Sequence, residues 1–402
     1  MKQIDIISPL LIPCSTQTTE SNKTGSWRYL RPLFDEKTSP CSTACPAGED
    51  IARIEMLTAQ GSFKEAWEMI LRENPFPGVC GRVCPHPCEG VCNRKEFDEA
   101  IAIHSIERFL AETAGRYELK PILPRLIEKK QKIAIVGAGP AGLSAAYFMG
   151  LLGYSCDVFE AMPEAGGILR WGIPAYRLPL SALRGDISRI ESHSIRIITG
   201  RTLGAEFIRE AEGRYDAVFM GCGHSRAVKL GVPGEAGALV EDGLEFLRRV
   251  RRADTISVSG VSAVIGGGNT AIDVARTIIR LGGKAVILYR RRRRDMPAFE
   301  EEVRMGLEEG VELRELIAPA MIAAHRNQCV MTLQEMDVTG EDSRGRAVTT
   351  PATGKTSEMR VERIFRATGA EPGEDCFSLP ERKGASLALS HTFLVCRDRG
   401  PA

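Results

Sequence analysis

The stretch IAIVGAGPAGLSAAYFMGLLGYSCDVFE, residues 133–160, decides the fold of this chain. It reads as an apolar strand, a glycine-rich turn, a helix and a second strand that ends at Glu160. In such a turn the first glycine permits a tight bend, the second lets backbone amides approach a pyrophosphate, and the third lets the helix pack on the sheet. We therefore predict a dinucleotide-binding α/β domain with the phosphates at the N-terminus of the helix.

The dinucleotide contacts expected in this first unit come from the turn and from the acidic end of the second strand. Glu160 is placed to accept hydrogen bonds from ribose hydroxyls. A lone glycine match is a weak signal, but here the strand, the helix and the acid all stand where the fingerprint needs them. The turn residues predicted to line the phosphates are Gly137, Gly139, Pro140, Ala141 and Gly142.

A second strand–turn–helix–strand unit, SAVIGGGNTAIDVARTIIRLGGKAVILYRR, occupies residues 262–291. Alanine stands at its third turn position, which the fingerprint permits. Because one such unit holds one dinucleotide, two units predict an α/β protein with two Rossmann-like domains. The turn residues predicted to bind the second dinucleotide are Gly266, Gly268, Asn269, Thr270 and Ala271.

Five consecutive arginines, residues 290–294, follow the last strand of the second unit, where an acid for the adenosine ribose would otherwise stand. Arginine at this place favours a 2′-phosphate, so NADP(H) is predicted over NAD(H), which stays the alternative. Arg290 and Arg291 carry this prediction. The later arginines could equally form a solvated basic turn.

Six of the twelve cysteines lie close together in the sequence, at Cys41, Cys45, Cys80, Cys84, Cys88 and Cys92. The last four are spaced four residues apart, but two prolines and two glycines among them, including Gly81, argue against one continuous helix. This predicts a looped segment that turns its sulfurs toward a shared metal centre. Zinc competes, because it also takes four cysteines at short spacing, but the Cys45-Pro46 dipeptide and a neighbouring redox cofactor favour iron and sulfur.

Composition restricts the partners and the location of the protein. A net charge of +1 argues against a nucleic acid or a membrane surface as the main partner. The N-terminus lacks a basic leader and a small-residue cleavage site, and no apolar run reaches the roughly 18 residues that span a bilayer. Cysteines in a chain without a secretion signal are expected to be reduced or metal-bound. We therefore predict a cytoplasmic protein.

At 402 residues the chain exceeds what one core usually organises, and its motifs divide it into four parts. An extended arm is expected over residues 1–36, followed by a helical cysteine domain over 37–130. The first dinucleotide domain is predicted to combine residues 131–225 with 366–402. The second is predicted to occupy residues 226–365.

Five motifs occur together in a specific order, namely CGRVCPHPCEGVC (80–92), GAGPAGLSAA (137–146), GGILRWGIPAYRLP (166–179), GGGNTAIDVA (266–275) and YRRRRRDMPA (289–298). With them the chain resembles the glutamate synthase small-subunit family. That family also includes the electron-entry half of dihydropyrimidine dehydrogenase and the large subunit of ferredoxin:NADP transhydrogenases. The resemblance implies a helical iron–sulfur domain followed by an FAD domain into which an NAD(P)H domain is inserted.

By this resemblance the first glycine turn binds FAD and the second binds the nicotinamide nucleotide. The family's Ala-Thr-Gly motif appears at residues 367–369, so Gly369 is predicted to belong to the FAD site. The glycine–aspartate motif that normally follows is absent, which predicts an FAD site that is incomplete at its C-terminal end. Residues that the resemblance places near the reactive flavin ring are Gly166, Gly167, Gly172, Ile173 and Pro174.

The resemblance also implies ligands for a [4Fe-4S] cluster near the flavin, namely Cys45, Cys84, Cys88 and Glu107. Glu107 could equally be an exposed acid on a helix. Relatives with two clusters carry an additional Cys-x2-Cys before the position of Cys41, and this chain has none, so one cluster is predicted with a second left open. A second cluster would have to use Cys41, Cys80 and Cys92, with Cys14 or a partner residue as the fourth ligand.

As a function, the resemblance implies a flavin-dependent NAD(P)H oxidoreductase subunit. It would pass electrons between NAD(P)H, FAD, a cluster and a partner, either a larger catalytic subunit or an iron–sulfur protein. The flavin motif holds no cysteine pair, which argues against a disulfide reductase, and no catalytic residue is assigned. One alternative is the flavin subunit of a tungsten aldehyde oxidoreductase or formate dehydrogenase complex. The other is a non-catalytic, partner-binding subunit with a lost FAD site.

Overall fold

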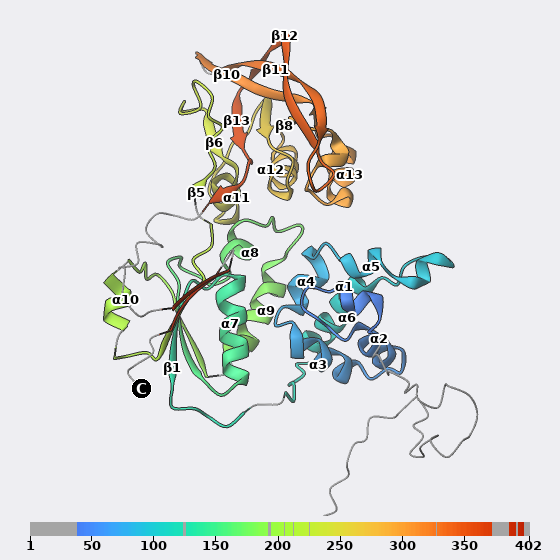
Figure 1. Ribbon diagram of the computed structural model, residues 1–402, viewed down its shortest axis with the longest axis vertical. Coiled ribbons are helices and arrows are strands. Elements are labelled where there is room, and N and C mark those ends of the chain that lie inside the picture. Colours follow the sequence, from blue (N-terminus) through green and yellow to red (C-terminus); the bar gives the residue numbers. More distant parts are fainter. Residues whose placement is uncertain are drawn as a thin grey trace, which may run out of the picture. The chain divides into compact units, whose positions relative to one another are not determined.

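A computed structural model describes residues 38–371 of the chain with short gaps, together with the backbone of two later strands (Figure 1). The gaps are residues 124–125, 192–193, 205, 212, 225 and 327, and the later strands are β15 (Ser386–Ser390) and β16 (Phe393–Arg397). The chain divides into two units, Met1–Ser39 and Pro40–Ala402, and the elements below belong to the second. The predicted arm and Cys14 lie outside the described residues.

Short helices make up the region that begins at Pro40. They are α1 (Pro40–Ala44), α2 (Ile51–Ala59), α3 (Phe63–Glu73), α4 (Pro77–Val83), α5 (Pro87–Gly90), the 3-10 turn η2 (Asn93–Glu96) and α6 (Ile103–Arg116). Asp50 begins α2 by accepting a hydrogen bond from the backbone N–H of Arg53. Helices α2, α3 and α6 share an apolar core that contains Trp67, Leu71 and Leu110. Burial of these side chains, rather than helix length, holds such short helices in place.

The cysteine run after α3 differs from the looped segment predicted for it. Two short helices, α4 and α5, carry Cys80 and Cys88, and Cys84 ends α4 with an extended backbone. Gly81 lies inside α4 and does not break it. A methyl group at Gly81 would lie 2.6 Å from the backbone nitrogen of Arg108 in α6, so glycine is needed there for close helix packing. The run is therefore broken by its prolines, while this glycine serves the packing of α4 on α6.

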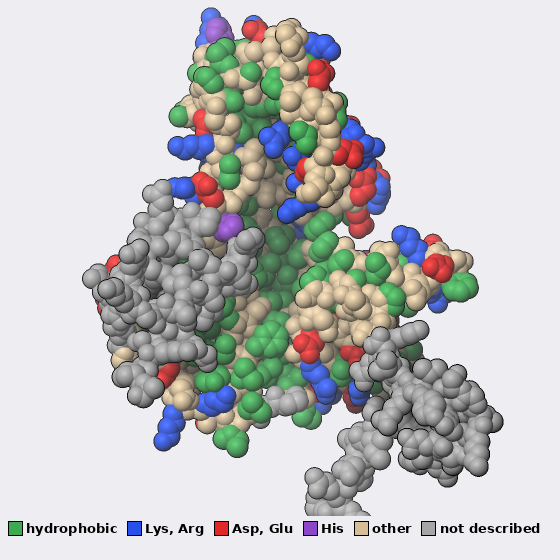
Figure 2. All heavy atoms as spheres, in the orientation of Figure 1, with side chains coloured by type: hydrophobic (Ala, Val, Ile, Leu, Met, Phe, Trp, Pro, Cys, Tyr) green, Lys and Arg blue, Asp and Glu red, His purple; other side chains and the backbone are tan. Residues whose placement is uncertain are grey.

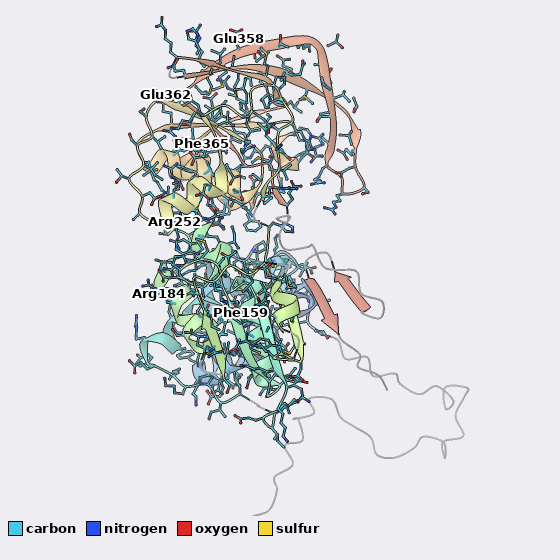
Figure 3. All side chains as sticks on the ribbon, turned by 90° about the vertical axis from the view of Figure 1, so that its left-hand side faces the viewer. Phe159, Arg184, Arg252, Glu358, Glu362 and Phe365 are labelled. Atoms are coloured by element: carbon cyan, nitrogen blue, oxygen red, sulfur yellow. The ribbon has the colours of Figure 1, made fainter. Side chains whose placement is uncertain are left out.

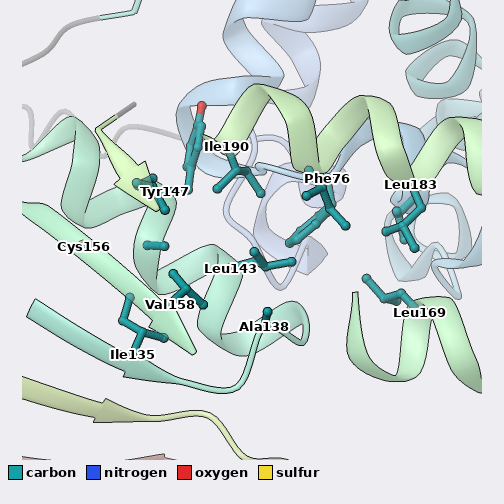
Figure 4. Packing of buried hydrophobic residues seen from close by; sticks show 14 of the residues in the cluster. Phe76, Ile135, Ala138, Leu143, Tyr147, Cys156, Val158, Leu169, Leu183 and Ile190 are labelled. Carbon is teal, nitrogen blue, oxygen red and sulfur yellow. The ribbon is translucent and has the colours of Figure 1, made fainter. Parts of the chain in front are cut away.

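The first glycine turn lies in a six-stranded sheet of order β15-β16-β4-β1-β2-β3. Its parallel strands are β1 (Lys132–Val136), β2 (Ser155–Phe159), β3 (Ile195–Ile198) and β4 (Ala217–Met220), and β16 runs antiparallel to β4. The associated helices are α7 (Pro140–Leu151), α8 (Gly167–Trp171), α9 (Leu180–Glu191) and α10 (Glu206–Ala211). Leu143 and Tyr147 of α7 pack with Leu183 and Ile190 of α9 in the core (Figure 4).

The second glycine turn lies in a five-stranded parallel sheet of order β6-β13-β7-β8-β9. Its strands are β6 (Val240–Asp242), β7 (Val261–Ile265), β8 (Lys284–Tyr289), β9 (Glu312–Glu315) and β13 (Arg363–Arg366). The associated helices are α11 (Gly243–Arg251), α12 (Asn269–Arg280) and α13 (Glu300–Glu308), with the 3-10 turn η3 (Arg293–Asp295). The predicted α/β class with two Rossmann-like domains is confirmed.

A three-stranded antiparallel sheet follows β9, and the sequence did not predict it. It consists of β10 (Ile317–His325), β11 (Gln328–Glu341) and β12 (Ala347–Val361), in that order. Met331 and Leu333 of β11 are fully buried against the parallel sheet, in one cluster with Val286 and Leu288 of β8. The two chain segments that connect the two large sheets pair as antiparallel strands, β5 (Arg226–Ala227) and β14 (Ala370–Glu371).

Aromatic pairs help to fill both large domains. Phe159 of β2 stacks edge-on against Phe207 of α10 with ring centroids 5.0 Å apart, and the ring centroid of Phe365 of β13 lies 4.6 Å from that of Phe246 of α11. Phe159 and Phe365 are labelled in Figure 3. On the surface, charges of both signs gather over α13, where Arg304 pairs with Glu308 (Figure 2). Among the described residues, no helix combines the length and the apolar character that crossing a membrane needs.

The close packing of α4 on α6 is testable by substitution of Gly81. We expect Gly81→Ala to lower the free energy of unfolding by about 1–3 kcal/mol, because the added methyl group must displace the backbone of α6. Gly115→Ala on α6 is the matched control, since nothing lies within 4 Å of its methyl position. Urea denaturation of both variants would measure the difference, and an equal or stabilising effect of both would contradict this packing argument.

Candidate functional site

The two glycine turns are built in the same way. Gly137 and Gly266 have positive φ angles of 99° and 141°, a conformation that favours glycine. A methyl group at Gly137 would overlap the carbonyl oxygen of Gly221, and one at Gly266 would overlap that of Ala367. Gly221 directly follows β4 and Ala367 directly follows β13. Each turn therefore crosses the end of the neighbouring strand at an equivalent place and leaves no room for a side chain.

The two turns differ at their third position, which is Gly142 in the first and Ala271 in the second. A methyl group at Gly142 would overlap the carbonyl oxygen of Gly137, so only glycine fits the first turn. In the second turn, the Ala271 side chain is accommodated and fully buried. Gly139 and Gly268 precede the first residues of α7 and α12. The N–H groups of the first turn of each helix lack partners within the helix, and this is where phosphates bind.

Glu160 is fixed beside the first turn at the end of β2. Its Oε2 accepts a hydrogen bond from the backbone N–H of Ala138 at 2.8 Å, and its Oε1 accepts one from Met162 at 2.8 Å. The carboxylate is buried, so these contacts replace water around it. A carboxylate held here is positioned for the ribose hydroxyls of a dinucleotide. The assignment of Glu160 to the ribose stays a prediction.

The flavin motif predicted from the resemblance lies against the first turn. The N–H of Gly166 donates to the carbonyl of Ala138 at 2.8 Å, and a methyl group at Gly167 would lie 2.6 Å from Cα of Gly139. Gly172 and Ile173 donate to the carbonyl of Ile168 and end α8. Two segments separated in the sequence thus pack closely through their glycines, because added Cβ atoms would collide with neighbouring protein atoms.

A pocket of about 300 Å³ lies where the flavin motif, the second turn and the strand end after β13 meet. It is lined by Ile168 of the flavin motif, Thr270 of the second turn and Gly369 of the Ala-Thr-Gly motif. The sequence did not identify several other lining residues, among them His224, Asp242 and Leu244. They belong to no motif. Asp242 is nevertheless a residue type typical of helix N-caps, and it caps α11 by accepting a hydrogen bond from the N–H of Glu245.

The five arginines after β8 have different roles. Arg292 pairs with Asp295 and Glu341, Arg293 with Glu300, and Arg294 with Glu341. The hydrogen bonds from Arg292 lower the pKa of Asp295 to about 2. Among the described residues, Arg290 and Arg291 form no ion pair. They are therefore the two arginines whose charge is not already neutralised by a carboxylate.

The segment after these arginines closes over the second turn. Tyr289 packs on the turn so closely that a methyl group at Gly267 would lie 2.5 Å from its ring. Asn269, which was predicted to bind the nucleotide, accepts a hydrogen bond at its Oδ1 from the N–H of Phe299 at 3.0 Å. The N–H of Ala298 donates to the carbonyl of Gly267 at 3.2 Å. Asn269 thus also joins the second turn to the segment that follows η3.

Four of the predicted cluster cysteines, Cys41, Cys45, Cys84 and Cys88, lie in one neighbourhood. Cys88 packs in an apolar cluster with Cys41 and Cys45. Burial raises the pKa of Cys88 to about 12, and the nearby Glu89, Cys45 and Cys84 add to this rise. Burial likewise raises the pKa of Cys84, with contributions from Glu107 and Cys45. Bound iron would offset both effects, because it stabilises the thiolate form.

Glu107 is buried, so its alternative interpretation as an exposed helix acid is wrong. Asn74 donates from its Nδ2 to Glu107 Oε1 at 2.8 Å and to Glu49 Oε1 at 2.9 Å. Asn74 Oδ1 also lies 3.7 Å from Cys80 Sγ. Burial raises the pKa of Glu107 well above its usual value, and Glu49 and Asp186 add to the rise. Asn74 and Glu49 were not identified from the sequence, because neither stands in a cysteine motif.

The candidate cluster ligands Cys45, Cys84 and Cys88 form no disulfide. No three His, Cys, Asp or Glu side chains among the described residues are arranged to hold one metal ion. Cysteine thiolates are the usual ligands of iron–sulfur clusters, so these thiols fit the predicted cluster. The individual ligands stay a prediction.

Arg177 of the flavin motif joins the two dinucleotide domains through a buried ion pair. Its Nη1 donates to both carboxylate oxygens of Asp273 in α12, at 3.0 and 2.7 Å, and its Nε lies 2.9 Å from Glu302 in α13. Beside it, the ring of Tyr176 lies 4.1 Å from the guanidinium of Arg280. Because α12 begins at the second glycine turn, this contact links the flavin motif to the nucleotide loop.

These features define a class of protein, an oxidoreductase with two dinucleotide folds and a cysteine-rich helical domain. Residues 131–392 match the family described as pyridine nucleotide-disulphide oxidoreductase, and the chain belongs to it. Residues 32–119 match dihydropyrimidine dehydrogenase domain II, 4Fe-4S cluster. The order of the two matches confirms the predicted resemblance to the glutamate synthase small-subunit family. It also confirms the predicted cofactor classes, a 4Fe-4S cluster, FAD and NADP(H).

Two curated relatives cover most of the chain. It is 35% identical over 372 residues to the NADPH-Fe(3+) oxidoreductase subunit beta of Geobacter sulfurreducens. This match covers 90% of this chain and 55% of the relative. It is 34% identical over 286 residues to the glutamate synthase [NADPH] small chain of Halomonas elongata. This match covers 68% of this chain and 61% of the relative. The chain thus spans a little more than half the length of these relatives.

A solved structure shows the same fold. Mycobacterium tuberculosis FprA in complex with NADPH superposes with a TM-score of 0.53 at 19% sequence identity. The match covers 61% of this chain and 72% of FprA.

Replacement of Arg177 tests the ion pair between the two domains. We expect Arg177→Met to lower the free energy of unfolding by about 3–5 kcal/mol at neutral pH, because Asp273 stays buried without its cation. Burial already raises the pKa of Asp273 to about 7. Protonation of Asp273 removes the buried negative charge that Arg177 would otherwise balance. The loss of stability caused by Arg177→Met should therefore shrink at acid pH, where Asp273 is neutral, and grow at alkaline pH, where it is ionised.

Urea denaturation at about pH 5.5 and about pH 8 measures this difference. Arg304→Met is the control, since its exposed pair with Glu308 should contribute less than about 1 kcal/mol. A loss for Arg177→Met that matches the control, or that grows toward acid pH, would contradict the role assigned to the pair.

Proposed function

We propose that this chain is the electron-entry subunit of an NADPH-dependent oxidoreductase. It would accept a hydride from NADPH at FAD and pass the electrons through a [4Fe-4S] cluster to a partner. The observation that carries the proposal is the pocket at which both dinucleotide folds converge, lined by Ile168, Thr270 and Gly369. A nicotinamide ring and a flavin ring must meet at one place for hydride transfer, and this pocket borders both predicted binding sites.

The chain's own residues would divide the binding of the two cofactors. Gly137, Gly139 and Gly142 would hold the FAD pyrophosphate at α7, while Glu160 would accept from its ribose. FAD supplies the conversion of a two-electron hydride into single electrons, which an iron–sulfur cluster can carry. The contact between Arg177 and Asp273 would keep the second turn at a fixed place relative to the flavin motif.

In the second domain the same logic gives a preference for NADPH. Gly266 and Gly268 would bring the pyrophosphate to the N-terminus of α12. Arg290 and Arg291 would bind the 2′-phosphate, because the other arginines of the run are already paired with carboxylates. The names of both curated relatives specify NADPH, which supports this choice.

For the cluster we propose Cys45, Cys84, Cys88 and Glu107 as ligands. Cys45 adds to the raised pKa of both Cys84 and Cys88, and Cys84 adds to that of Cys88. Glu107 is buried, adds to the raised pKa of Cys84 and is held by Asn74. Cys41 and Cys80 lie in the same neighbourhood and could serve a second cluster together with Cys92.

A partner protein is part of the proposal, because electrons that reach the cluster need an acceptor. The relatives are named as a beta subunit and a small chain, which supports a larger partner. We propose that the partner is a catalytic subunit or an iron–sulfur electron-transfer protein. A tungsten aldehyde oxidoreductase or formate dehydrogenase complex would use the same electron path.

The visible spectrum of the purified protein tests the proposal directly. We expect flavin bands on a broad iron–sulfur absorbance, and anaerobic addition of NADPH should bleach the flavin bands. A colourless protein that contains zinc would contradict the proposal and would favour a partner-binding subunit without FAD.

The role of the free arginines predicts a change in nucleotide preference. We expect Arg291→Gln to raise the KM for NADPH about 10- to 100-fold, because a charge-assisted hydrogen bond contributes about 1.5–3 kcal/mol. The KM for NADH should change little, since NADH lacks the 2′-phosphate. Arg294→Gln is the control within the same run, because Arg294 already pairs with Glu341. Steady-state reduction of an artificial acceptor measures both constants, and a parallel rise for NADH would contradict the assignment.

A further inference from the structure

Residues 74–80 connect the helical cysteine domain to the core of the FAD domain. Phe76 and Val79 come from the helical region, yet they are buried in the same apolar cluster as Leu143, Leu183 and Ile190 of the FAD domain (Figure 4). At 5% and 3% exposure, the two side chains are as deeply buried as ordinary core residues. Burial of side chains of this size contributes about 1.5–3 kcal/mol each, so the segment is anchored in the FAD domain.

A buried carboxylate on α9 holds the backbone of this segment. Asp186 accepts hydrogen bonds from the N–H of Val79 at 3.0 Å and from that of Gly78 at 3.4 Å. Arg189 donates from its Nη2 to Asp186 Oδ1 at 2.8 Å and to the carbonyl of Pro75 at 2.7 Å. Asp186 is only 3% exposed, so these bonds form where water does not compete.

The opposite side of the same segment faces the cysteine neighbourhood. Asn74 holds Glu107 and Glu49 through its Nδ2, and it accepts from the N–H of Phe76 at 2.8 Å through its Oδ1. Cys80 directly follows Val79, and Cys84 ends the same helix. A shift of the backbone at Gly78 and Val79 would therefore move the cysteines of α4 relative to the FAD domain.

We infer that Asp186 is a positioning residue for electron transfer between FAD and the cluster, acting through the backbone of residues 78–79. This inference rests on the proposed function and deepens it. For each NADPH oxidised, bound FAD would take up one hydride and would release its two electrons one at a time to the cluster, which would pass each to the acceptor. The hydrogen of the hydride would leave the flavin as a proton. The rate of electron transfer falls steeply with the distance between the flavin and the cluster. Holding α4 in place would therefore keep this distance, and with it the rate, constant.

The chain offers two ways to perturb this contact and one close control. Asp186→Asn keeps the shape of the side chain but removes the charge that pairs with Arg189. Gly78→Ala leaves Asp186 intact and places a methyl group 3.1–3.3 Å from its carboxylate, so the two groups must separate slightly. Gly185→Ala is the control, because it lies beside Asp186 on α9 and nothing lies within 4 Å of its methyl position.

Anaerobic stopped-flow mixing with NADPH, on the full chain with its cofactors, separates the two electron-transfer steps. We expect flavin reduction in Asp186→Asn and Gly78→Ala to stay within about twofold of wild type, and cluster reduction to slow by about tenfold or more. Gly185→Ala should match wild type in both steps. Equal loss of both steps, or cluster reduction at the wild-type rate in both variants, would overturn the inference.

Hydrogen–deuterium exchange gives a readout that does not depend on turnover. The amides of Gly78 and Val79 should exchange faster in Asp186→Asn, because their shared acceptor is weakened, and the effect should be larger at Gly78, since Val79 also donates to the carbonyl of Phe76 at 3.1 Å. Amides in the core of α7 should keep their protection. Unchanged exchange at these two amides would overturn the inference. A wild type whose flavin is not reduced by NADPH would instead contradict the proposed function, and the exchange measurement would still decide whether Asp186 holds α4.

Discussion

Backbone packed on backbone at the two glycine turns is the constraint on which the rest of the structure depends. At Gly137 and Gly266 the chain passes so close to the end of a neighbouring strand that a methyl group would overlap a carbonyl oxygen. The helix that follows each turn therefore begins at a fixed place at the carboxyl edge of its sheet. Both predicted cofactor sites, and the pocket that borders them, follow from this repeated geometry.

The stretch from the flavin motif to α9 contacts both the second dinucleotide domain and the helical cysteine domain. Arg177 forms the buried pair with Asp273 on the helix that starts at the second turn. Further along the same stretch, Asp186 accepts hydrogen bonds from the backbone N–H groups of Gly78 and Val79. These residues directly precede Cys80 in α4. Hydride entry and electron exit would thus both be positioned from one continuous stretch of the FAD domain.

Much of the fold was readable from the sequence because its signals are local. Each glycine turn stands between a strand and a helix within about 30 residues, so spacing alone predicted both Rossmann-like domains. The sheet of β10, β11 and β12 was missed because it follows β9 directly and carries no motif. Gly81 was misread as a helix breaker, because only the distance to Arg108 on another helix reveals its packing role. Asn74 and Asp186 were missed for the same reason, since their partners lie up to 108 residues away in the chain.

The order in which the cofactors are reduced tests the central claim most directly. Wild-type protein mixed anaerobically with NADPH and frozen at successive times can be examined by optical and electron paramagnetic resonance spectroscopy. We expect flavin absorbance to be lost first and the signal of the reduced cluster to rise afterwards at the expense of the reduced flavin. A cluster signal that appears without prior loss of flavin absorbance, or that never appears while the flavin stays reduced, would contradict this claim.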